Sequence, residues 1–230
     1  MNEQKPWPRF NAPDGHLQVF KIFRTIQGEG PLVGTPAVFV RLAGCILQCP
    51  WCDTDYTSTS MEWSVSQVID LIERTGREDR LVVITGGEPF RQNPVPLIRQ
   101  LLLEGYKVQV ETNGVKIPKD LPWDDSSFCV VCSPKISVDP QLQARGLIGR
   151  VFWKYVLEAG YIGVDGLPTR ALGNDRPPGR PTHSGVEVFV QPMDSGNEDQ
   201  NRLNLEAVIE SCMSHGYRLC LQIHKIAGLE

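Results

Sequence analysis

The sequence predicts an α/β fold of mostly parallel strands, because short segments rich in β-forming residues alternate with helical patterns along the chain. Several expected strands are continuous apolar runs, which indicates a sheet buried on both faces. Alternation at this spacing implies βαβ units, and the handedness of their crossovers leaves a barrel, a partial barrel or a doubly wound sheet. In each of these folds, ligands bind at the carboxyl ends of the strands.

Val, Ile, Phe and Tyr concentrate in eight segments that we expect to be strands: residues 17–23, 37–42, 81–85, 107–112, 128–133, 151–157, 186–191 and 217–223. A helix is expected from Ser64 to Gly76, because Ser64 and Gln67 have the spacing of a capping box and a glycine commonly ends a helix. Apolar spacing predicts further helices over 94–104 and 199–215. The apolar positions expected in the last helix are Leu203, Leu205, Val208, Ile209 and Cys212.

Length and composition exclude several classes of protein. The chain has 230 residues, 41% of them hydrophobic, and a formal net charge of −4. We therefore expect a single soluble domain over residues 1–230 that does not bind nucleic acid through phosphate neutralisation. No apolar run is long enough to span a membrane. The start of the sequence lacks a signal peptide, so a cytoplasmic location is expected, where cysteines serve metals or chemistry more often than disulfides.

Two segments are expected to fall outside the regular pattern. The Pro-rich first residues of the chain are expected to be mobile. Residues 160–185 are rich in Gly and Pro and are expected to form an insertion with little regular structure. Such an insertion is either an exposed segment without a role or a lid over the site.

Three of the seven cysteines form the strongest chemical signal. Cys45, Cys49 and Cys52 have the spacing C-x3-C-x2-C directly after an expected strand. Three soft thiolate ligands favour zinc or an iron–sulfur cluster. Three ligands leave one iron of a four-iron cluster open, whereas a structural zinc needs a fourth ligand from the protein.

The other four cysteines are expected to be buried thiols. Cys129 and Cys132 have a C-x2-C spacing but lie too far along the chain from Cys52 for a zinc ribbon. They also fall in an expected strand, where residues three apart point to opposite faces. Cys212 and Cys220 are expected in the core because free cysteine is commonly buried.

The cysteine spacing resembles the signature of radical S-adenosylmethionine (SAM) enzymes. In that superfamily the methionine part of SAM chelates the open iron, and reductive cleavage of SAM gives a 5′-deoxyadenosyl radical that abstracts hydrogen from the substrate. Trp51 has the position of the superfamily's aromatic residue near the adenine. Thr85-Gly-Gly-Glu-Pro89 follows a strand, like the motif that binds the SAM amine. Two glycines let the backbone approach a ligand, and the adjacent carboxylate can meet a cation.

Over nearly the whole chain, the sequence resembles the 7-carboxy-7-deazaguanine synthase family. The matching segments are residues 25–30, 36–45, 52–54, 85–89, 111–114, 133–135, 191–194 and 222–225. The resemblance implies an abbreviated, partial (β/α) barrel of the radical SAM type with fewer than six helices, and a homodimer. It implies that 6-carboxy-5,6,7,8-tetrahydropterin is converted to 7-carboxy-7-deazaguanine by ring contraction with loss of ammonia, in queuosine biosynthesis. A flavodoxin-like or other donor would supply the electron.

The resemblance also implies the residues of the site. The substrate would contact Ile26, Gln27, Gly28, Glu29, Arg41, Thr85, His224 and the terminal carboxylate of Glu230. SAM would contact Trp51, Cys52, Asp53, Gly87, Ser133, Pro134, Lys135, Gln191, Pro192, Met193 and Asp194. Cys45, Cys49 and Cys52 would bind the 4Fe-4S cluster. Thr54 would bind Mg²⁺ together with substrate oxygens and water.

Two features depart from the family pattern. Ile46 stands where the family usually has Asn. The insertion over residues 160–185 is longer than expected for the family. Lys154 either faces the site or caps the sheet, and no role is assigned to it. Two alternatives remain open: an activase of glycyl-radical enzymes, which has a similar cysteine motif and acts on a protein, and a non-catalytic binding module stabilised by zinc.

Overall fold

A curved sheet organises the part of the chain that the structure describes. The computed structural model describes residues 2–12, 15–144, 150–171, 176–183 and 185–229. The strands are β1 (Leu17–Ile26), β2 (Pro36–Leu42), β3 (Met61–Trp63), β4 (Leu81–Gly86), β5 (Lys107–Thr112), β6 (Phe128–Cys132), β7 (Val151–Leu157), β8 (Val188–Pro192) and β9 (Arg218–Leu219). Their order in the sheet is β3-β1-β2-β4-β5-β6-β7-β8-β9.

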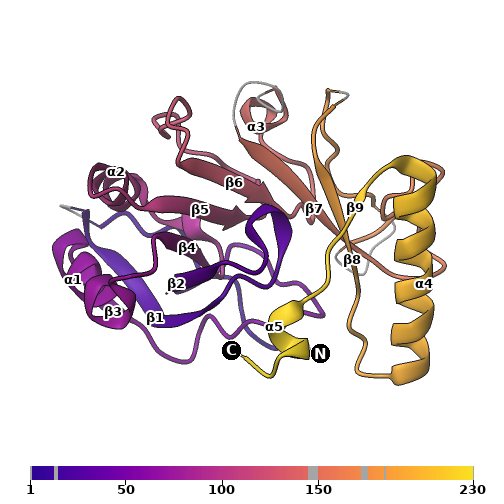
Figure 1. The fold of residues 1–230 in the computed structure, drawn as a ribbon, viewed down its shortest axis with the longest axis horizontal. Helices are drawn as coiled ribbons and strands as arrows, with labels where there is room; N and C mark the ends of the chain where they lie inside the picture. The colour runs from indigo at the N-terminus through magenta and orange to yellow at the C-terminus, as the bar shows by residue number, and fades with distance from the viewer. Residues whose placement is uncertain (1, 13–14, 145–149, 172–175, 184, 230) are drawn as a thin grey trace.

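The sheet is mostly parallel and open, as expected for a partial barrel. β1 is antiparallel to its neighbours β2 and β3, and every neighbouring pair from β2 to β9 is parallel. β3 and β9 form the two free edges of the sheet (Figure 1). The predicted fold class is confirmed.

Few helices cover this sheet. They are α1 (Val65–Gly76), α2 (Val95–Leu103), α3 (Pro140–Ala144), α4 (Glu198–His215) and α5 (Ile223–Ile226). Figure 1 shows α1 and α2 at one end of the sheet and α4 at the other, beside β8 and β9. In the described residues, the crossovers from β5 to β6 and from β7 to β8 contain no helix. Nor does this part of the chain contain a helix with the length and apolar character needed to cross a bilayer.

β4 shows why continuous apolar runs predict its type of strand. All four residues from Leu81 to Ile84 are at most 2% exposed. Val82 and Ile84 belong to the main hydrophobic core, which also contains buried residues of α1 and α2. Leu81 and Val83 belong to a separate cluster, against which Leu32 packs. Successive side chains of β4 therefore fill two different cores, one on each face of the sheet.

The loop that follows β1 lies on the concave side of the sheet. The side chain of Gln27 donates a hydrogen bond to Glu111 on β5 at 3.0 Å. A Cβ atom added to Gly30 would lie 3.7 Å from Val131 on β6, and Glu29 forms an ion pair with Lys154 on β7. β5, β6 and β7 are separated from β1 in the sheet by β2 and β4, so a flat sheet could not make these contacts.

The start of α1 is as predicted. Ser64 is the N-cap, and its side chain accepts a hydrogen bond from the backbone N–H of Gln67 at 3.3 Å. The side chain of Gln67 accepts one from the backbone N–H of Ser64 at 2.9 Å. Both bonds of a capping box are therefore present, and they pair two N–H groups at the helix start that have no partner within the helix.

The buried face of α4 differs from the expected one. Val208 is buried as predicted, but Leu203 and Ile209 are 48% and 45% exposed. Asn204 and Ser211 take the buried positions instead. The Asn204 amide donates to the carbonyl of Met193 at 2.8 Å and its oxygen accepts from the N–H of Ala159 at 2.8 Å. Tertiary hydrogen bonds therefore orient this helix together with the buried Val208.

The strand expected over 217–223 is wrong in most of its length. Only Arg218–Leu219 pairs with β8, and Ile223–Ile226 forms the short helix α5. His224 therefore lies on a helix and not at a strand end. The N–H of Ile223 donates to the carbonyl of Gly28 at 3.2 Å, which turns the chain onto the loop after β1.

The described residues between 160 and 185 have little regular structure, as predicted, but they are attached to the body of the protein. The guanidinium of Arg180 pairs with Asp165 at 2.9 Å. The N–H of Gly179 donates to the carbonyl of Ile136 at 2.8 Å, just after β6. The hydroxyl of Tyr155 on β7 donates to the carbonyl of Gly179 at 2.7 Å. The last two bonds join the described part of the insertion to the loop that follows β6 and to β7.

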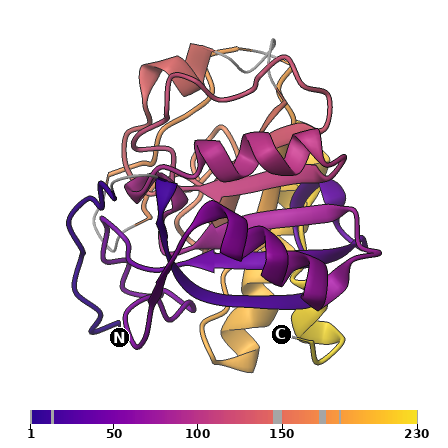
Figure 2. The same cartoon turned by 90° about the vertical axis from the view of Figure 1, so that its left-hand side faces the viewer.

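Residues 2–10, here called the N-terminal strap, differ from the expectation of a mobile start. The N–H of Trp7 donates to the carbonyl of Cys45 at 2.7 Å, and the N–H of Asn2 donates to the carbonyl of Pro50 at 2.9 Å. Figure 2 shows the strap in indigo as an extended segment at the side of the molecule. Backbone hydrogen bonds to the cysteine segment thus fix a part of the chain that contains two prolines spaced by Trp7.

We predict that Ser64→Ala lowers the free energy of unfolding by about 1 kcal/mol, because the capping box loses its hydroxyl. Urea denaturation followed by circular dichroism measures this change. Ser60→Ala, at an exposed position outside any helix, is the control and is expected to change little. Equal unfolding energies for the two variants would contradict the prediction.

Candidate active site

A cavity of about 540 Å³ lies where the parallel strands end. Side chains from successive strands line it, among them Thr85 on β4, Glu111 on β5, Lys154 on β7 and Gln191 on β8. The cysteine segment after β2, the loop after β1 and the helix α5 supply the rest of the wall. The predicted position of the site, at the carboxyl ends of the strands, agrees with this geometry.

Cys45, Cys49 and Cys52 all line this cavity. Cys45 is buried and the other two are half-buried. Burial raises the pKa of all three thiols, that of Cys45 to about 12. Thiols in such surroundings lose their protons when a soft metal ion binds, because the metal compensates the buried charge.

The number of thiols in the cavity wall suits a cluster that keeps one position for a ligand from outside the protein. Within the described residues, no three His, Cys, Asp or Glu side chains are gathered as closely as one metal ion requires. In an iron–sulfur cubane, each cysteine binds a different iron, so the three sulfur atoms can lie further apart. The three cysteines that line the cavity would therefore fit a 4Fe-4S cluster, with one iron left without a protein thiolate.

The two glycines after Thr85 hold the cysteine segment against β4. The N–H of Gly87 donates to the carbonyl of Leu42 at 3.1 Å, and the N–H of Glu88 donates to the carbonyl of Gly44 at 3.0 Å. A Cβ atom on Gly87 would lie 2.2 Å from the Gly44 oxygen. The glycine was expected to admit a ligand, and the structure shows that it also admits the backbone next to Cys45.

Glu88, expected to meet a cation, is turned away from the cavity. Its carboxylate accepts hydrogen bonds from the Thr112 hydroxyl at 2.6 Å, from the N–H of Asn113 at 2.8 Å and from the N–H of Phe90 at 3.0 Å. Burial raises the pKa of Glu88. The side chain joins the ends of β4 and β5 and does not line the cavity.

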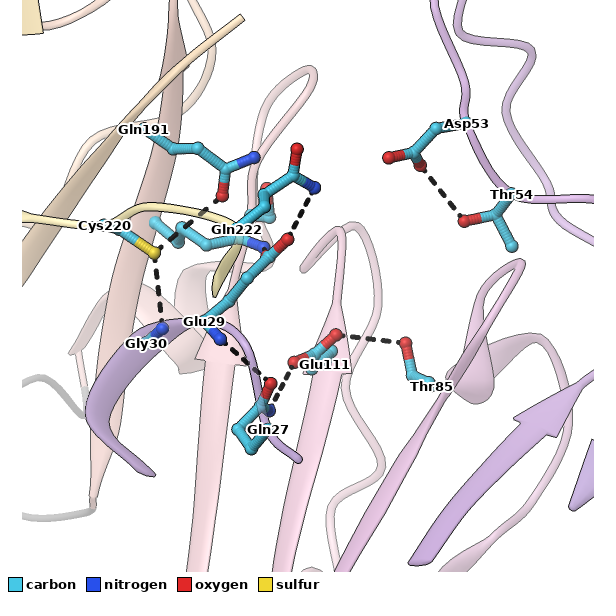
Figure 3. A network of polar contacts seen from close by, with 12 residues as sticks. Gln27, Glu29, Gly30, Asp53, Thr54, Thr85, Glu111, Gln191, Cys220 and Gln222 are labelled. Atoms are coloured by element: carbon cyan, nitrogen blue, oxygen red, sulfur yellow. Dashed lines mark hydrogen bonds and ion pairs between the residues drawn. The ribbon is translucent and has the colours of Figure 1, made fainter. Parts of the chain in front are cut away.

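Glu111 was part of a matching segment in the sequence but had no assigned role. Its carboxylate accepts hydrogen bonds from the amides of Gln27 at 3.0 Å and Gln109 at 3.1 Å, and from the Thr85 hydroxyl at 3.1 Å (Figure 3). Gln27 and Thr85, both predicted substrate ligands, are thereby joined across the cavity. A carboxylate held by three donors presents a fixed acceptor edge.

Glu29 and Lys154 form a nearly buried ion pair in the cavity wall. Their side chains are 12% and 11% exposed, and the Gln222 amide donates a second hydrogen bond to Glu29 at 2.7 Å. Burial alone would raise the pKa of Glu29, but the charge of Lys154 and the hydrogen bonds hold it below its usual value. Burial likewise opposes the charge of Lys154, whose pKa the Glu29 carboxylate raises above its usual value. No local pattern in the sequence indicates this pair, because its members are 125 residues apart.

Arg41 and His224, two other predicted substrate ligands, also line the cavity. The guanidinium of Arg41 lies over the ring of Phe23, 4.9 Å from its centroid. The ring of His224 lies directly against Gly28, where an added Cβ atom would be 1.9 Å from Nδ1. Only glycine therefore lets α5 sit on the loop after β1 at this point.

A second group of polar residues faces the cysteines. Lys135 donates to the hydroxyl and the carbonyl of Ser133 at 2.7 and 2.8 Å, and burial lowers the pKa of its amine. Lys225 lies 3.5 Å from the carboxylates of both Asp53 and Asp194. The Thr54 hydroxyl donates to Asp53 at 3.3 Å. Figure 3 shows Asp53 and Thr54 on the side of the site opposite Gln191 and Cys220.

Most of the predicted site residues meet in this one cavity. It is lined by Ile26, Gln27, Glu29, Arg41, Cys45, Cys49, Trp51, Cys52, Asp53, Thr54, Thr85, Gly87, Ser133, Lys135, Gln191, Met193, Asp194 and His224. Gly28, Pro134 and Pro192 are next to lining residues without lining it themselves. Glu230 lies outside the described residues, although its neighbour Leu229 lines the cavity. Of the residues described between 160 and 185, none does, so the lid interpretation gains no support.

The remaining cysteines are largely as expected. Cys129, Cys132 and Cys220 are buried, whereas Cys212 is only partly buried against the core. Cys220 has two further contacts: its sulfur accepts a hydrogen bond from the N–H of Gly30 at 3.3 Å, and its thiol donates one to the side-chain oxygen of Gln191 at 3.8 Å. It thus supports the loop after β1 from behind the cavity.

The cysteine segment and the adjoining strand ends define a class of protein. Residues 40–122 match the model of the radical SAM superfamily. The chain is therefore a radical SAM enzyme, a class that uses a 4Fe-4S cluster and SAM.

Comparison with known proteins narrows the class. The chain is 43% identical to the 7-carboxy-7-deazaguanine synthase of Rhodospirillum rubrum, over 91% of each chain. It is 34% identical to that of Rickettsia prowazekii, over 93% of this chain and 89% of the relative. The crystal structure of QueE from Escherichia coli matches with a TM-score of 0.64 and 26% identity, over 90% of this chain and 94% of that one. The chain belongs to the 7-carboxy-7-deazaguanine synthase family.

We predict that Lys154→Met lowers the free energy of unfolding by about 3 to 5 kcal/mol at pH 7, because Glu29 is left charged and buried. Adding Glu29→Gln should recover part of this loss. Since the pKa of Glu29 is lowered, the stabilisation in the unaltered protein is present above its ordinary pKa of 4.5 and is lost as the pH falls through the lowered value.

The control for this prediction is Arg202→Met. Arg202 pairs with Asp199 on α4, but the two side chains are 69% and 86% exposed. We expect a change below about 1 kcal/mol for this exposed pair. Denaturation curves of the unaltered protein and the three variants provide the test. Equal losses of unfolding free energy for Lys154→Met and Arg202→Met would contradict the prediction.

Proposed function

We propose that the cavity converts 6-carboxy-5,6,7,8-tetrahydropterin to 7-carboxy-7-deazaguanine, by radical ring contraction with loss of ammonia, within one radical SAM domain. The observation that carries this proposal is the meeting of three cysteines with a hydrogen-bonded polar wall around one cavity, in a chain of the 7-carboxy-7-deazaguanine synthase family. The names of its relatives state the product, and the queuosine pathway uses it.

Cys45, Cys49 and Cys52 are proposed to hold the 4Fe-4S cluster, which when bound supplies the electron that cleaves SAM. Trp51, Gly87, Ser133, Lys135 and the segment 191–194 are proposed to hold SAM. Support comes from their position, because the cavity extends from the cysteines to these residues. Glycine backbone and hydroxyl groups suit the polar parts of SAM, and an indole face suits an adenine.

The opposite wall is proposed to bind the pterin. The carboxylates of Glu29 and Glu111 are fixed acceptors for the N–H groups at the edge of a pterin ring, and Gln27 adds an amide beside them. Arg41 is proposed to hold the substrate carboxylate, since a guanidinium can donate two parallel hydrogen bonds to it. Lys154, His224 and Thr85 complete this wall.

The proposed reaction is tested by mass identification of the product. After anaerobic reconstitution the protein should hold four irons and, with SAM, reductant and the carboxypterin, form 7-carboxy-7-deazaguanine. Replacing Cys45, Cys49 or Cys52 by Ala is expected to abolish SAM cleavage, whereas Cys212→Ala should leave it intact because that thiol lies away from the cavity. A reconstituted protein that cleaves SAM without forming this product would refute the proposal, and a glycyl radical formed on a partner protein would favour an activase.

Thr54 is proposed as a protein ligand of Mg²⁺, with substrate oxygens and water completing the shell. It lines the cavity next to Asp53, whose carboxylate its hydroxyl contacts. Thr54→Val is expected to raise the Mg²⁺ concentration for half-maximal rate by at least about tenfold while leaving the iron content unchanged. Thr59→Val, at an exposed position in the same segment, is the control. Identical Mg²⁺ curves for the three proteins would show that Thr54 is not a ligand.

The partners of the enzyme are also proposals. The family resemblance favours a homodimer, and the exposed Leu203, Ile209 and Met213 on α4 are candidates for its interface, which sedimentation of Met213→Glu would test. A flavodoxin-like protein is proposed as the electron donor in the cytoplasm. The terminal carboxylate of Glu230 is proposed to reach the pterin, and residues appended after it should then weaken substrate binding.

A further inference from the structure

The three cysteines lie on a segment with no regular structure of its own. Residues 43–60, here called the cysteine loop, contain no helix and no strand. Backbone carbonyls in such a segment have no ladder to pair with, although buried ones need partners. The loop has a few bonds of its own, such as the one from the N–H of Gly44 to the carbonyl of Tyr56 at 2.8 Å, and contacts from outside it supply the rest.

The N-terminal strap supplies several of these contacts. The N–H of Trp7 donates to the carbonyl of Cys45 at 2.7 Å. At the other end of the strap, the side-chain amide of Asn2 donates to the carbonyl of Cys49 at 3.0 Å, and its backbone N–H donates to Pro50 at 2.9 Å. Two of the three cysteines thus have their carbonyls held by the strap.

Gln4 makes the central contact. Its amide nitrogen donates to the carbonyl of Thr54 at 3.0 Å, and its amide oxygen accepts from the N–H of Tyr56 at 2.8 Å. The Tyr56 side chain, only 1% exposed, lines the cavity and donates through its hydroxyl to the Gln4 carbonyl at 3.1 Å. The side chain of one glutamine therefore pairs with the backbone of Thr54 and Tyr56, shortly after Cys52.

Arg91 anchors the strap to the body of the protein. Its guanidinium donates to the carbonyl of Pro8 at 2.7 Å and to the carbonyl of Ala43 at 3.0 and 3.1 Å. The same guanidinium lies over the ring of Trp7, 5.4 Å from its centroid. Trp7 packs so closely on Gly44 that an added Cβ atom there would be 2.7 Å from the ring. The strap and the start of the cysteine loop are therefore one packed unit.

The strap also has a docked face and a free face. Asn2, Gln4 and Trp7 are partly buried, whereas Glu3 and Lys5 are exposed. This pattern matches the hydrogen bonds, which come from the inward positions. It also provides exposed neighbours that can be altered without touching the cysteine loop.

We infer that the N-terminal strap is a clamp that keeps the cysteine loop in the geometry that retains the iron–sulfur cluster, with Gln4 as its main positioning residue. The inference rests on the proposed function, since it takes Cys45, Cys49 and Cys52 as the cluster ligands. It adds a contribution from residues 2–10, which none of the sequence motifs include.

The test measures loss of the cluster from the full chain. Anaerobically reconstituted protein is mixed with an iron chelator, and the visible absorbance of the cluster is followed with time. Gln4→Met keeps about the size of the side chain but removes its three hydrogen bonds, to Thr54, Tyr56 and the Thr57 hydroxyl. It is expected to lose its cluster at least about tenfold faster, the ratio given by the lower limit for three net hydrogen bonds. Glu3→Gln and Lys5→Met are the matched controls and should lose it at the rate of the unaltered protein. The rate of cluster loss from Asn2→Ala should lie between the rates of Gln4→Met and of the two controls.

A second measurement separates local from general effects. The melting temperature of the metal-free Gln4→Met protein is expected to match that of the Lys5→Met protein, and the electron paramagnetic resonance spectrum of its reduced cluster is expected to change. Unchanged loss rates would overturn the inference, as would a metal-free variant that melts much earlier than its control. If the unaltered protein itself failed to take up four irons, the proposed function would fail and not the clamp alone.

Discussion

The ion pair between Glu29 and Lys154 is the constraint on which the site depends. The sheet is open, with free edges at β3 and β9, so hydrogen bonds between strands do not fix how strongly it curves. Glu29, on the loop after β1, and Lys154, on β7, connect distant parts of the sheet across its concave side. Both charges are nearly buried, and separating them would leave each without a counterion, so the pair holds the curvature that brings Gln27 to Glu111 and makes the cavity.

The curved sheet forms the base of the cavity, and much of the cavity wall is made of segments without regular structure. Each is positioned by a few specific contacts: Gly87 against Gly44, the buried carboxylate of Glu88 between two strand ends, and the strap against the cysteine loop. A cluster, a sulfonium cofactor and a pterin differ in shape and charge, and loops can adapt to each where strands cannot. The rigid sheet below them keeps the loops at constant distances, which is the usual division between scaffold and site.

Local signals in the sequence predicted most of the fold. The strands over 107–112 and 151–157 have the predicted bounds, and α1 begins at its capping box, because each depends on neighbouring residues. The sequence motifs also predicted one site for the cysteines, Thr85 and Gln191, and all of them line one cavity. The features that the sequence did not predict all depend on contacts between residues distant in the sequence. Asn204 is buried because it bonds to Met193 and Ala159. Lys154 pairs with a glutamate 125 residues away. The start of α5 is bonded to the carbonyl of Gly28, on the loop after β1.

The contact of α5 with the cysteine loop has a consequence for how the enzyme is made. Lys225 lies 3.5 Å from Asp53 but follows it by 172 residues. At roughly 5 to 20 residues per second, the ribosome completes that wall of the cavity roughly 10 to 30 s after it has made the cysteines. During this interval the three thiols have no finished cavity around them, and of their neighbours only those that precede them in the chain, the strap, β1, β2 and the loop between these strands, have been made. A cluster delivered into the complete cavity is therefore delivered only after α5 has been made, long after the three thiols themselves.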